Sequence, residues 1–197
     1  MLELKNITKV FNTTGQKGDE VVALDDMSLT IEDGEFVTVI GSNGSGKSTT
    51  MNMITGSIFP DSGNIILNGK DITKMKEYQR AKYFGRVFQD PMMGTAADMS
   101  VVENLEIAYR RGKRHSPIKW GFNRENKEMF IQELRRFDLG IEDRLNKKVG
   151  TMSGGQRQAL TLLMASLQKP EILLLDEHTA ALDPKTAQKV LSLTEKI

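Results

Sequence analysis

The first third of the chain alternates short apolar runs with polar stretches, a pattern typical of β-strands joined by surface loops. Runs rich in Val, Ile, Leu, Thr and Phe occupy residues 2–11 and 21–40, and the polar, glycine-bearing residues 12–20 separate them. A further run at residues 63–69 ends in Asn68-Gly69, a strong signal of a tight hairpin turn. We therefore predict antiparallel β-structure in this part of the chain.

Two continuous apolar runs predict another kind of strand, covered on both faces in a parallel sheet. Residues 35–40 lead into a glycine-rich turn and a helix-compatible stretch at residues 47–55. Residues 172–175 lead into a polar turn and a helix at residues 184–197, with Pro184 in its first position. The repeated order of strand, turn and helix predicts an α/β fold.

The stretch between these two units, residues 98–168, has a mostly helical pattern. Phe130, Leu134 and Phe137 recur at helical spacing and form one predicted apolar face. A second predicted face consists of Leu160, Leu163, Met164 and Leu167. The helix that begins at Pro184 reaches Ile197 with no Gly or Asn to cap it, so we expect the domain to be C-terminally truncated.

Composition favours one soluble globular domain. Of 197 residues, 39% are hydrophobic and 27% charged, and 27 Lys+Arg against 26 Asp+Glu leave a net charge of +1. Balanced charge disfavours nucleic-acid binding through bulk positive potential. No run approaches the roughly 18 apolar residues of a membrane-spanning helix, no signal-like block opens the chain, and the absence of cysteine excludes disulfides and thiolate chemistry. We expect a cytoplasmic protein.

Residues 41–49 match the phosphate-loop pattern G-x-x-x-x-G-K-[ST] and lie between a predicted buried strand and a predicted helix start. In that pattern, glycines turn backbone N–H groups toward one anion and the helix N-terminus adds its positive dipole end. The alternative, an ordinary glycine-rich turn, does not account for both flanks. The candidate nucleotide-binding residues are Gly41, Ser42, Asn43, Gly44, Ser45, Gly46, Lys47, Ser48 and Thr49.

Within this phosphate loop, three side chains have separate predicted roles. Lys47 would bridge β- and γ-phosphate oxygens, the Ser48 hydroxyl would ligate Mg²⁺, and Thr49 would support phosphate.

A phosphate loop needs a carboxylate that holds the metal, and Asp176 follows the apolar run at residues 172–175. Asp176 would hold Mg²⁺ directly or through water, and the adjacent Glu177 would polarise a water for in-line attack on the γ-phosphate. Alone, Asp-Glu after a strand is equally an acidic helix-capping turn. Together with the phosphate loop, the two residues favour a catalytic pair.

A third motif at residues 151–160, which we call the signature segment, places a Ser-Gly-Gly turn at the start of an amphipathic helix. Ser153 fits a plain N-cap, which leaves Gly154, Gly155 and Gln156 unexplained. With the phosphate loop and residues 172–177, this segment resembles the ATP-binding-cassette ATPases, whose signature is L-S-G-G-Q. Met152 replaces the Leu, a volume-conserving change.

The resemblance assigns further roles. Phe11 resembles the aromatic residue that stacks on adenine, although an aromatic closing a strand is also a common core residue. Gln89 resembles the glutamine that contacts Mg²⁺ and senses the membrane partner, and Asp183 closes the loop that crosses to the other subunit. Ser153 and its neighbours in the signature segment would contact nucleotide bound by the opposite subunit. His178 is not the family's switch histidine, whose strand lies beyond the helix from Pro184.

The resemblance also implies an architecture: a phosphate-loop NTPase core with an N-terminal antiparallel β subdomain and a helical insertion. We place the core at residues 1–90 and 166–197 and the insertion, with the signature segment, at residues 91–165 of one domain. Implied ligands are ATP and Mg²⁺. Implied partners are a second copy or a related subunit, head to tail, an integral membrane permease and, indirectly, an extracytoplasmic substrate-binding protein. The implied location is the inner face of the cell membrane.

Alternatives remain for the function. One is a hydrolytically silent nucleotide-binding module, and another is a soluble relative acting on nucleic acid or ribosomes. A basic run with interleaved aromatics is either a nucleic-acid strip or, as we favour, a solvated face; it comprises Arg110, Arg111, Lys113, Arg114, His115, Lys119, Trp120, Phe122 and Arg124. Met92, Met93 and Met99 are either core filler or a groove for a permease helix. Residues 176–183 resemble uptake ATPases assigned to tryptophan or tyrosine.

Overall fold

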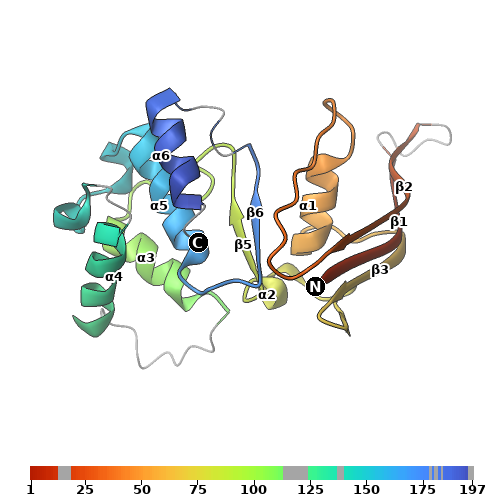
Figure 1. The fold of residues 1–197 in the computed structure, drawn as a ribbon, viewed down its shortest axis with the longest axis horizontal. Helices are drawn as coiled ribbons and strands as arrows, with labels where there is room; N and C mark the ends of the chain where they lie inside the picture. Colours follow the sequence, from red (N-terminus) through yellow and green to blue (C-terminus); the bar gives the residue numbers. More distant parts are fainter. Residues whose placement is uncertain are drawn as a thin grey trace. The chain divides into compact units, whose positions relative to one another are not determined.

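The computed structural model describes residues 1–12, 19–112, 124–136, 140–177, 179, 182 and 184–194. Figure 1 shows the course of the chain. The chain divides into two compact units, Met1–Arg80 and Ala81–Ile197.

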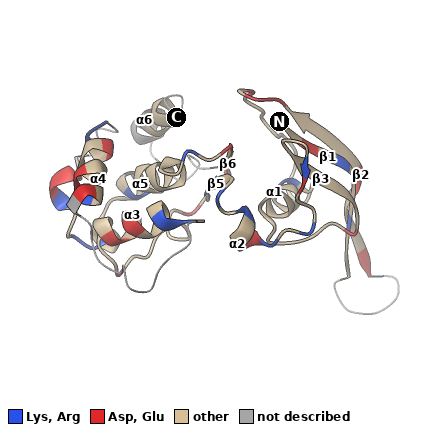
Figure 2. Ribbon diagram, turned by 90° about the horizontal axis from the view of Figure 1, so that it is seen from below, with Lys and Arg blue, Asp and Glu red and all other residues tan. Residues whose placement is uncertain are grey.

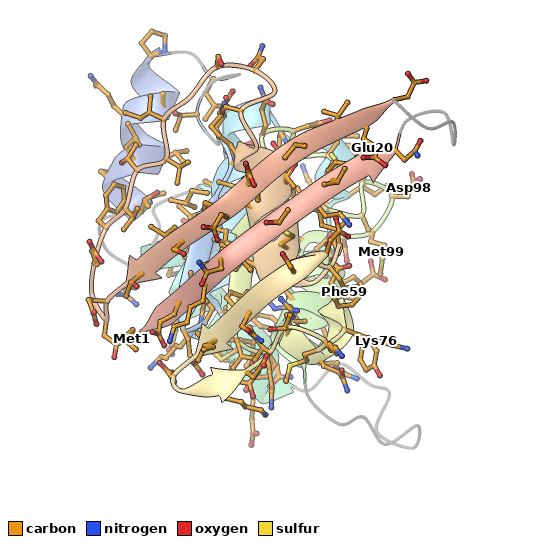
Figure 3. All side chains as sticks on the ribbon, turned by 90° about the vertical axis from the view of Figure 1, so that its right-hand side faces the viewer. Met1, Glu20, Phe59, Lys76, Asp98 and Met99 are labelled. Atoms are coloured by element: carbon orange, nitrogen blue, oxygen red, sulfur yellow. The ribbon has the colours of Figure 1, made fainter. Side chains whose placement is uncertain are left out.

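The first unit contains an antiparallel sheet in the order β2-β1-β3-β4. Its strands are β1 (Leu2–Asn12), β2 (Glu20–Ile31), β3 (Ser62–Leu67) and β4 (Lys70–Asp71). In Figure 3, Met1 lies beside the start of β1 and Glu20 begins β2 at the opposite end, as the pairing of Asn12 with Glu20 requires. The predicted antiparallel β-structure is therefore confirmed.

The hairpin between β3 and β4 turns at Asn68-Gly69, as predicted. Both residues have left-handed backbones, with φ of 48° and 75°, and Leu67 pairs with Lys70 across the turn. Asn and Gly tolerate positive φ better than other residues, which is why this dipeptide closes the hairpin. Alternate residues of the neighbouring strand β1, Leu2 and Leu4, are buried and form the inner face of the sheet.

Helix α1 (Lys47–Thr55) begins directly after the phosphate loop, as predicted. It ends at Gly56, whose φ of 84° lets its N–H donate to Asn52 O at 3.1 Å. The short helix α2 (Glu77–Arg80) closes the unit.

The prediction of a buried strand at residues 35–40 is wrong for this structure. No strand is assigned there, and Phe36 and Ile40 are 81% and 90% exposed. A strand exists only through hydrogen bonds to a neighbour, and the sheet of this unit ends at β2 and β4 without reaching these residues. Apolar composition alone therefore does not produce a strand.

The second unit pairs β5 (Phe84–Val87) with β6 (Ile172–Leu175) in parallel. The register runs from Phe84 opposite Ile172 to Val87 opposite Leu175. Parallel pairing of the apolar run at residues 172–175 confirms this half of the predicted parallel core.

The other elements described in the second unit are helices. They are α3 (Val101–Arg110), α4 (Arg124–Arg136), the short 3₁₀ turns η2 (Glu142–Arg144) and η3 (Val149–Thr151), α5 (Gly154–Ser166) and α6 (Pro184–Thr194). Charges of both signs are interspersed along α4 (Figure 2). Among the described residues, no helix is both long and apolar enough to cross a membrane.

The two predicted helical faces form the core of this unit. Phe130 and Leu134 on α4 and Leu160 and Leu163 on α5 are almost completely buried in one cluster. Met164 and Leu167 pack partly buried against it, whereas Phe137 lies outside the described residues. The boundaries of the helical insertion at residues 91–165 stay a prediction.

Candidate functional site

The phosphate loop has the backbone that an anion-binding loop requires. Gly44 and Gly46 adopt left-handed conformations, with φ of 83° and 89°, and α1 begins at the next residue, Lys47. Ser45 N–H donates to Ser42 O at 3.2 Å and closes the turn. Left-handed glycines before a helix start are the arrangement in which successive N–H groups form an anion-binding concavity.

The Lys47 ammonium lies over this loop. Its Nζ donates to Gly41 O at 2.7 Å and to Ser42 O at 2.9 Å. Two carbonyl oxygens of the phosphate loop therefore hold the Lys47 ammonium in place. Phosphate oxygens compete well for such a cation, because hydrogen bonds between charged groups are stronger than those to neutral carbonyls.

Gly46 is required for space as well as for its backbone angle. A Cβ atom there would lie 2.7 Å from Ala23 O and 2.8 Å from Leu24 Cδ2, both on β2. At Gly44, by contrast, a Cβ would meet nothing within 4 Å. The loop is therefore packed against the sheet at Gly46 and open to solvent at Gly44.

In the second unit, the ends of β5 and β6 bring Gln89 and Glu177 together. Gln89 Nε2 donates to Glu177 Oε2 at 3.3 Å. Asp176 continues the ladder beyond β6, since its N–H donates to Val87 O at 3.0 Å. Three of the predicted catalytic or metal-binding residues therefore lie at the carboxyl ends of two parallel strands, the edge where such sheets bind ligands, and two of their side chains are in contact.

Glu177 has a left-handed backbone, with φ of 40°, and is exposed. A non-glycine residue in this region costs on the order of 1 kcal/mol or more, and such strain concentrates at functional sites. The chain therefore has a strained backbone at the residue predicted to activate the attacking water.

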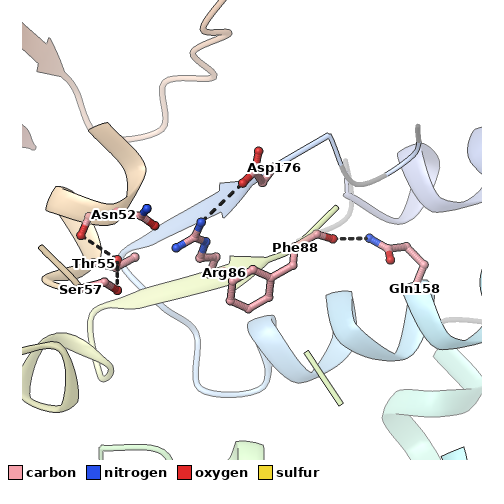
Figure 4. A network of polar contacts seen from close by, with 7 residues as sticks. All are labelled: Asn52, Thr55, Ser57, Arg86, Phe88, Gln158 and Asp176. Atoms are coloured by element: carbon pink, nitrogen blue, oxygen red, sulfur yellow. Dashed lines mark hydrogen bonds and ion pairs between the residues drawn. The ribbon is translucent and has the colours of Figure 1, made fainter. Parts of the chain in front are cut away.

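A contact that the sequence did not predict holds Asp176. Arg86 on β5 approaches it with Nη2 3.5 Å from Asp176 Oδ2. The Arg86 guanidinium also lies over the Phe88 ring, 4.6 Å from its centroid. Figure 4 shows this group between the ring and the carboxylate. The only available sequence signal was a charged residue inside an otherwise apolar strand.

The signature segment begins α5 with a reciprocal cap. Ser153 Oγ accepts a hydrogen bond from Gln156 N, and Gln156 Oε1 accepts one from Ser153 N, both at 3.3 Å. The view that a cap explains Ser153 but not Gln156 is therefore wrong, because this capping box uses both residues. Gly154 remains unexplained by the cap, since a Cβ there would meet nothing within 4 Å.

Behind the signature segment, Gln158 joins α5 to the end of β5. Its side chain is fully buried, and Nε2 donates to Phe88 O at 3.3 Å (Figure 4). Phe88 is the residue before Gln89. One hydrogen bond thus connects the signature helix with the segment that carries Gln89, a link that the sequence analysis missed.

The remaining predicted residues have different outcomes. Phe11 is 37% exposed, with Lys9 Nζ 5.4 Å from its ring centroid, so the alternative of a core residue is wrong. Met92 and Met93 are also exposed, which excludes core filler for these two. Asp183 and His178 lie outside the described residues, as does most of the basic run.

Among the described residues, no group of three or more His, Cys, Asp or Glu side chains is arranged to hold a metal ion alone. Mg²⁺ in nucleotide-binding proteins uses one or two carboxylates together with substrate phosphates, so this finding does not oppose such a site. Asp176 already attracts one cation, the Arg86 guanidinium. The donor chemistry at the end of β6 therefore fits a nucleotide-bound magnesium ion.

The family model described as ABC transporter matches residues 24–180. The tyrosine transport ATP-binding protein of Clostridioides difficile is 46% identical over 197 residues, which are 100% of this chain and 77% of that protein. A methionine import ATP-binding protein of Corynebacterium efficiens is 36% identical, and this chain covers 52% of its length. A phosphonates import ATP-binding protein of Alcaligenes faecalis is 34% identical over 98% of this chain and 68% of that protein.

Solved structures give the same result. A dimeric ATP-binding cassette in a post-hydrolysis state with ADP and Pi superposes with a TM-score of 0.82 at 30% identity, over 100% of this chain and 82% of that one. A cassette in its ADP conformation gives a TM-score of 0.76 at 31% identity, over 100% of this chain and 77% of that one. The fold is thus that of an ATP-binding cassette. The chain belongs to the ABC transporter family, as an ATP-binding ATPase.

Proposed function

We propose that this chain binds Mg·ATP through residues 41–49 and hydrolyses it to drive solute uptake through a membrane permease. The observation that carries the proposal is the phosphate loop, in which left-handed Gly44 and Gly46 lead into α1 and Lys47 Nζ lies over the loop carbonyls. An anion entering this loop gains backbone N–H donors, a helix N-terminus and a cation at once.

Each residue then has a distinct task. Lys47 moves from loop carbonyls to β- and γ-phosphate oxygens, Ser48 and Asp176 provide oxygen ligands for magnesium, and Thr49 supports phosphate. When bound, Mg²⁺ neutralises charge on the phosphate oxygens. Glu177 accepts the proton of the attacking water, and Gln89 is within hydrogen-bond distance of that carboxylate at 3.3 Å.

The complete site takes residues from two chains. We place Ser153, Gly154, Gly155 and Gln156 against nucleotide held by a partner subunit in a head-to-tail pair, with Asp183 at the crossing loop and Phe11 against adenine. Dimeric cassettes among the similar structures support this arrangement. The Ser153 cap also fixes the start of α5, so the segment is ordered before nucleotide arrives.

We further propose that the chain acts at the cytoplasmic face of a membrane, where a permease contacts it near Gln89 and the exposed Met92 and Met93. Exposed methionines form adaptable apolar surfaces that accept a partner helix. An extracytoplasmic binding protein would deliver solute to that permease. Similarity to the tyrosine transport protein supports aromatic amino acids as the solute class.

The test is nucleotide binding and turnover by purified wild-type chain and two variants. We expect calorimetry to detect Mg·ATP binding to wild type, and Lys47→Ala to lose it. Glu177→Gln should keep binding, lose hydrolysis and elute as a dimer with ATP on size-exclusion chromatography. Glu77→Gln, which changes an exposed carboxylate at the start of α2, is the matched control and should behave as wild type. Absence of binding by folded wild-type chain, or full turnover by Glu177→Gln, would contradict the proposal.

A further inference from the structure

Arg86 forms an ion pair that none of the roles above uses. It lies on β5 opposite Leu174, and Asp176 lies two residues after Leu174, just beyond β6, where its N–H still donates to Val87 O. Side chains alternate between faces along a strand, so residues two apart share a face. The pairing register therefore places Arg86 and Asp176 on the same side of the two-stranded sheet, which makes their contact a consequence of the fold.

The guanidinium is held from two sides. Nη2 lies 3.5 Å from Asp176 Oδ2, and the group stacks over Phe88 with 4.6 Å between its carbon and the ring centroid. Both partners are largely shielded, with 17% of the Arg86 side chain and 27% of the Asp176 side chain exposed. The contact is therefore screened less than a surface ion pair.

A cation at Asp176 Oδ2 opposes the approach of a second cation to the same carboxylate. Guanidinium and Mg²⁺ would share one carboxylate, and like charges within a few ångströms repel. The charge of Arg86 therefore weakens the attraction of Asp176 for a magnesium ion. The Arg86 side chain also stacks on Phe88, and this contact can persist when the ion pair with Asp176 weakens.

We propose that Arg86 is a positioning residue that sets the magnesium requirement of nucleotide binding. In the nucleotide-free chain it holds the Asp176 carboxylate and raises the Mg²⁺ concentration at which Mg·ATP binding is half-maximal. The inference rests on the proposed function, because it assumes that Asp176 meets nucleotide-bound magnesium. It adds a residue that acts through Asp176 and needs no contact with ATP.

The experiment measures binding of a fluorescent ATP analogue at fixed concentration while Mg²⁺ is varied, with folding checked by thermal unfolding. Arg86→Met keeps similar volume and an apolar contact with the Phe88 ring but removes the charge. We expect its half-maximal Mg²⁺ concentration to fall about three- to five-fold, the upper part of the range for an exposed ion pair, because this pair is partly shielded. Arg86→Lys keeps the charge but not the planar guanidinium, and its half-maximal Mg²⁺ concentration should lie between those of wild type and Arg86→Met.

The matched control is Arg144→Met, which removes an exposed arginine from η2 in the same unit and should leave the wild-type value unchanged. Should Arg86→Met not fold, Arg86→Gln carries the same test. An unchanged or higher magnesium requirement in the folded, charge-free variant, with wild type binding normally, overturns the role of Arg86 alone. Absence of analogue binding by wild type at every magnesium concentration instead contradicts the proposed function.

Discussion

Arg80 donates from Nη1 to Met53 O at 2.6 Å and holds the C-terminal end of α1, the helix that follows the phosphate loop. The same guanidinium donates to Ile54 O, Thr73 O and Met75 O, and its side chain is fully buried. A cation here complements the negative end of the helix dipole. Burial lowers the pKa of Arg80 to about 10, which leaves it charged at neutral pH.

Replacing Arg80 should therefore destabilise the first unit more than the loss of one surface charge does. Arg80→Met leaves several main-chain oxygens without their donor, and we expect the free energy of unfolding to fall by about 2–4 kcal/mol. Arg80→Lys retains the charge but not the planar set of N–H donors, and its free energy of unfolding should lie between those of Arg80→Met and wild type. Urea denaturation at pH 7 measures the difference, and equal stability of Arg80→Met and wild type would contradict this account.

The two left-handed glycines of the phosphate loop should respond differently to alanine. Gly44→Ala meets open space and incurs only the cost of positive φ, about 1 kcal/mol. Gly46→Ala adds a clash with Ala23 O at 2.7 Å, so the loop must move from β2. We expect Gly46→Ala to lose ATP binding at least tenfold more than Gly44→Ala. Titration calorimetry of both variants compares them, and a reversed order would contradict the packing argument.

The caps of α3 and α5 separate helix stability from the role of the signature segment. Ser100 and Ser153 both form capping boxes, with Glu103 and Gln156 respectively. Each Ser→Ala change should reduce the free energy of unfolding by about 1 kcal/mol. Only Ser153→Ala should also lower ATP turnover in the dimer, because Ser100 lies outside the proposed nucleotide site. Equal loss of turnover in both variants would assign the effect to helix stability alone.

Removing the backbone strain at Glu177 by substitution with glycine should stabilise the chain and abolish its ATPase activity. Glu177→Gly removes the cost of φ at 40° and should raise the free energy of unfolding by about 0.5–1 kcal/mol, net of the greater freedom of glycine in the unfolded chain. ATP turnover should be lost with the carboxylate. Glu177→Gln keeps the strained backbone and serves as the control, so a gain in stability by both variants would refute strain as the cause.

Asp61 should contribute to the acid sensitivity of the first unit. Its carboxylate accepts hydrogen bonds from Val10 N at 2.7 Å and Lys9 Nζ at 2.9 Å. The Val10 N–H, and then Lys9, lower the pKa of Asp61 below its ordinary value of 3.8. A lowered carboxyl pKa contributes stability above pH 3.8 that is lost as the pH falls through the folded-state value.

Asp61→Asn should therefore weaken the dependence of stability on pH in this acid range. Lys9→Met, which removes only one of the two partners, should weaken it less. Urea midpoints between pH 7 and about pH 3 measure the effect. An unaltered acid dependence in Asp61→Asn would show that Asp61 does not contribute.

Local signals in the sequence predicted much of the fold. Asn68-Gly69 specified its hairpin because the required backbone angles belong to those two residues. The faces of α4 and α5 followed from helical spacing. Residues 35–40 were predicted as a strand but are not one here, because a strand depends on a neighbour that local composition does not supply.

For the site, single motifs were predictable and the contacts between distant segments were not. The phosphate loop and Asp176-Glu177 were identified from order and spacing. The hydrogen bond from Gln158 to Phe88 O and the approach of Arg86 to Asp176 depend on how β5, β6 and α5 pack, which no local pattern encodes.

The parallel register of β5 and β6 determines whether Gln89 and Glu177 can meet. Val87 pairs with Leu175, and Gln89 and Glu177 each lie two positions beyond that pair. A one-residue insertion in either strand would shift the strand register and displace one of these residues from the other while each motif stayed unchanged. The contact between the Gln89 amide and the Glu177 carboxylate therefore depends on the equal length of the two segments that follow this pair.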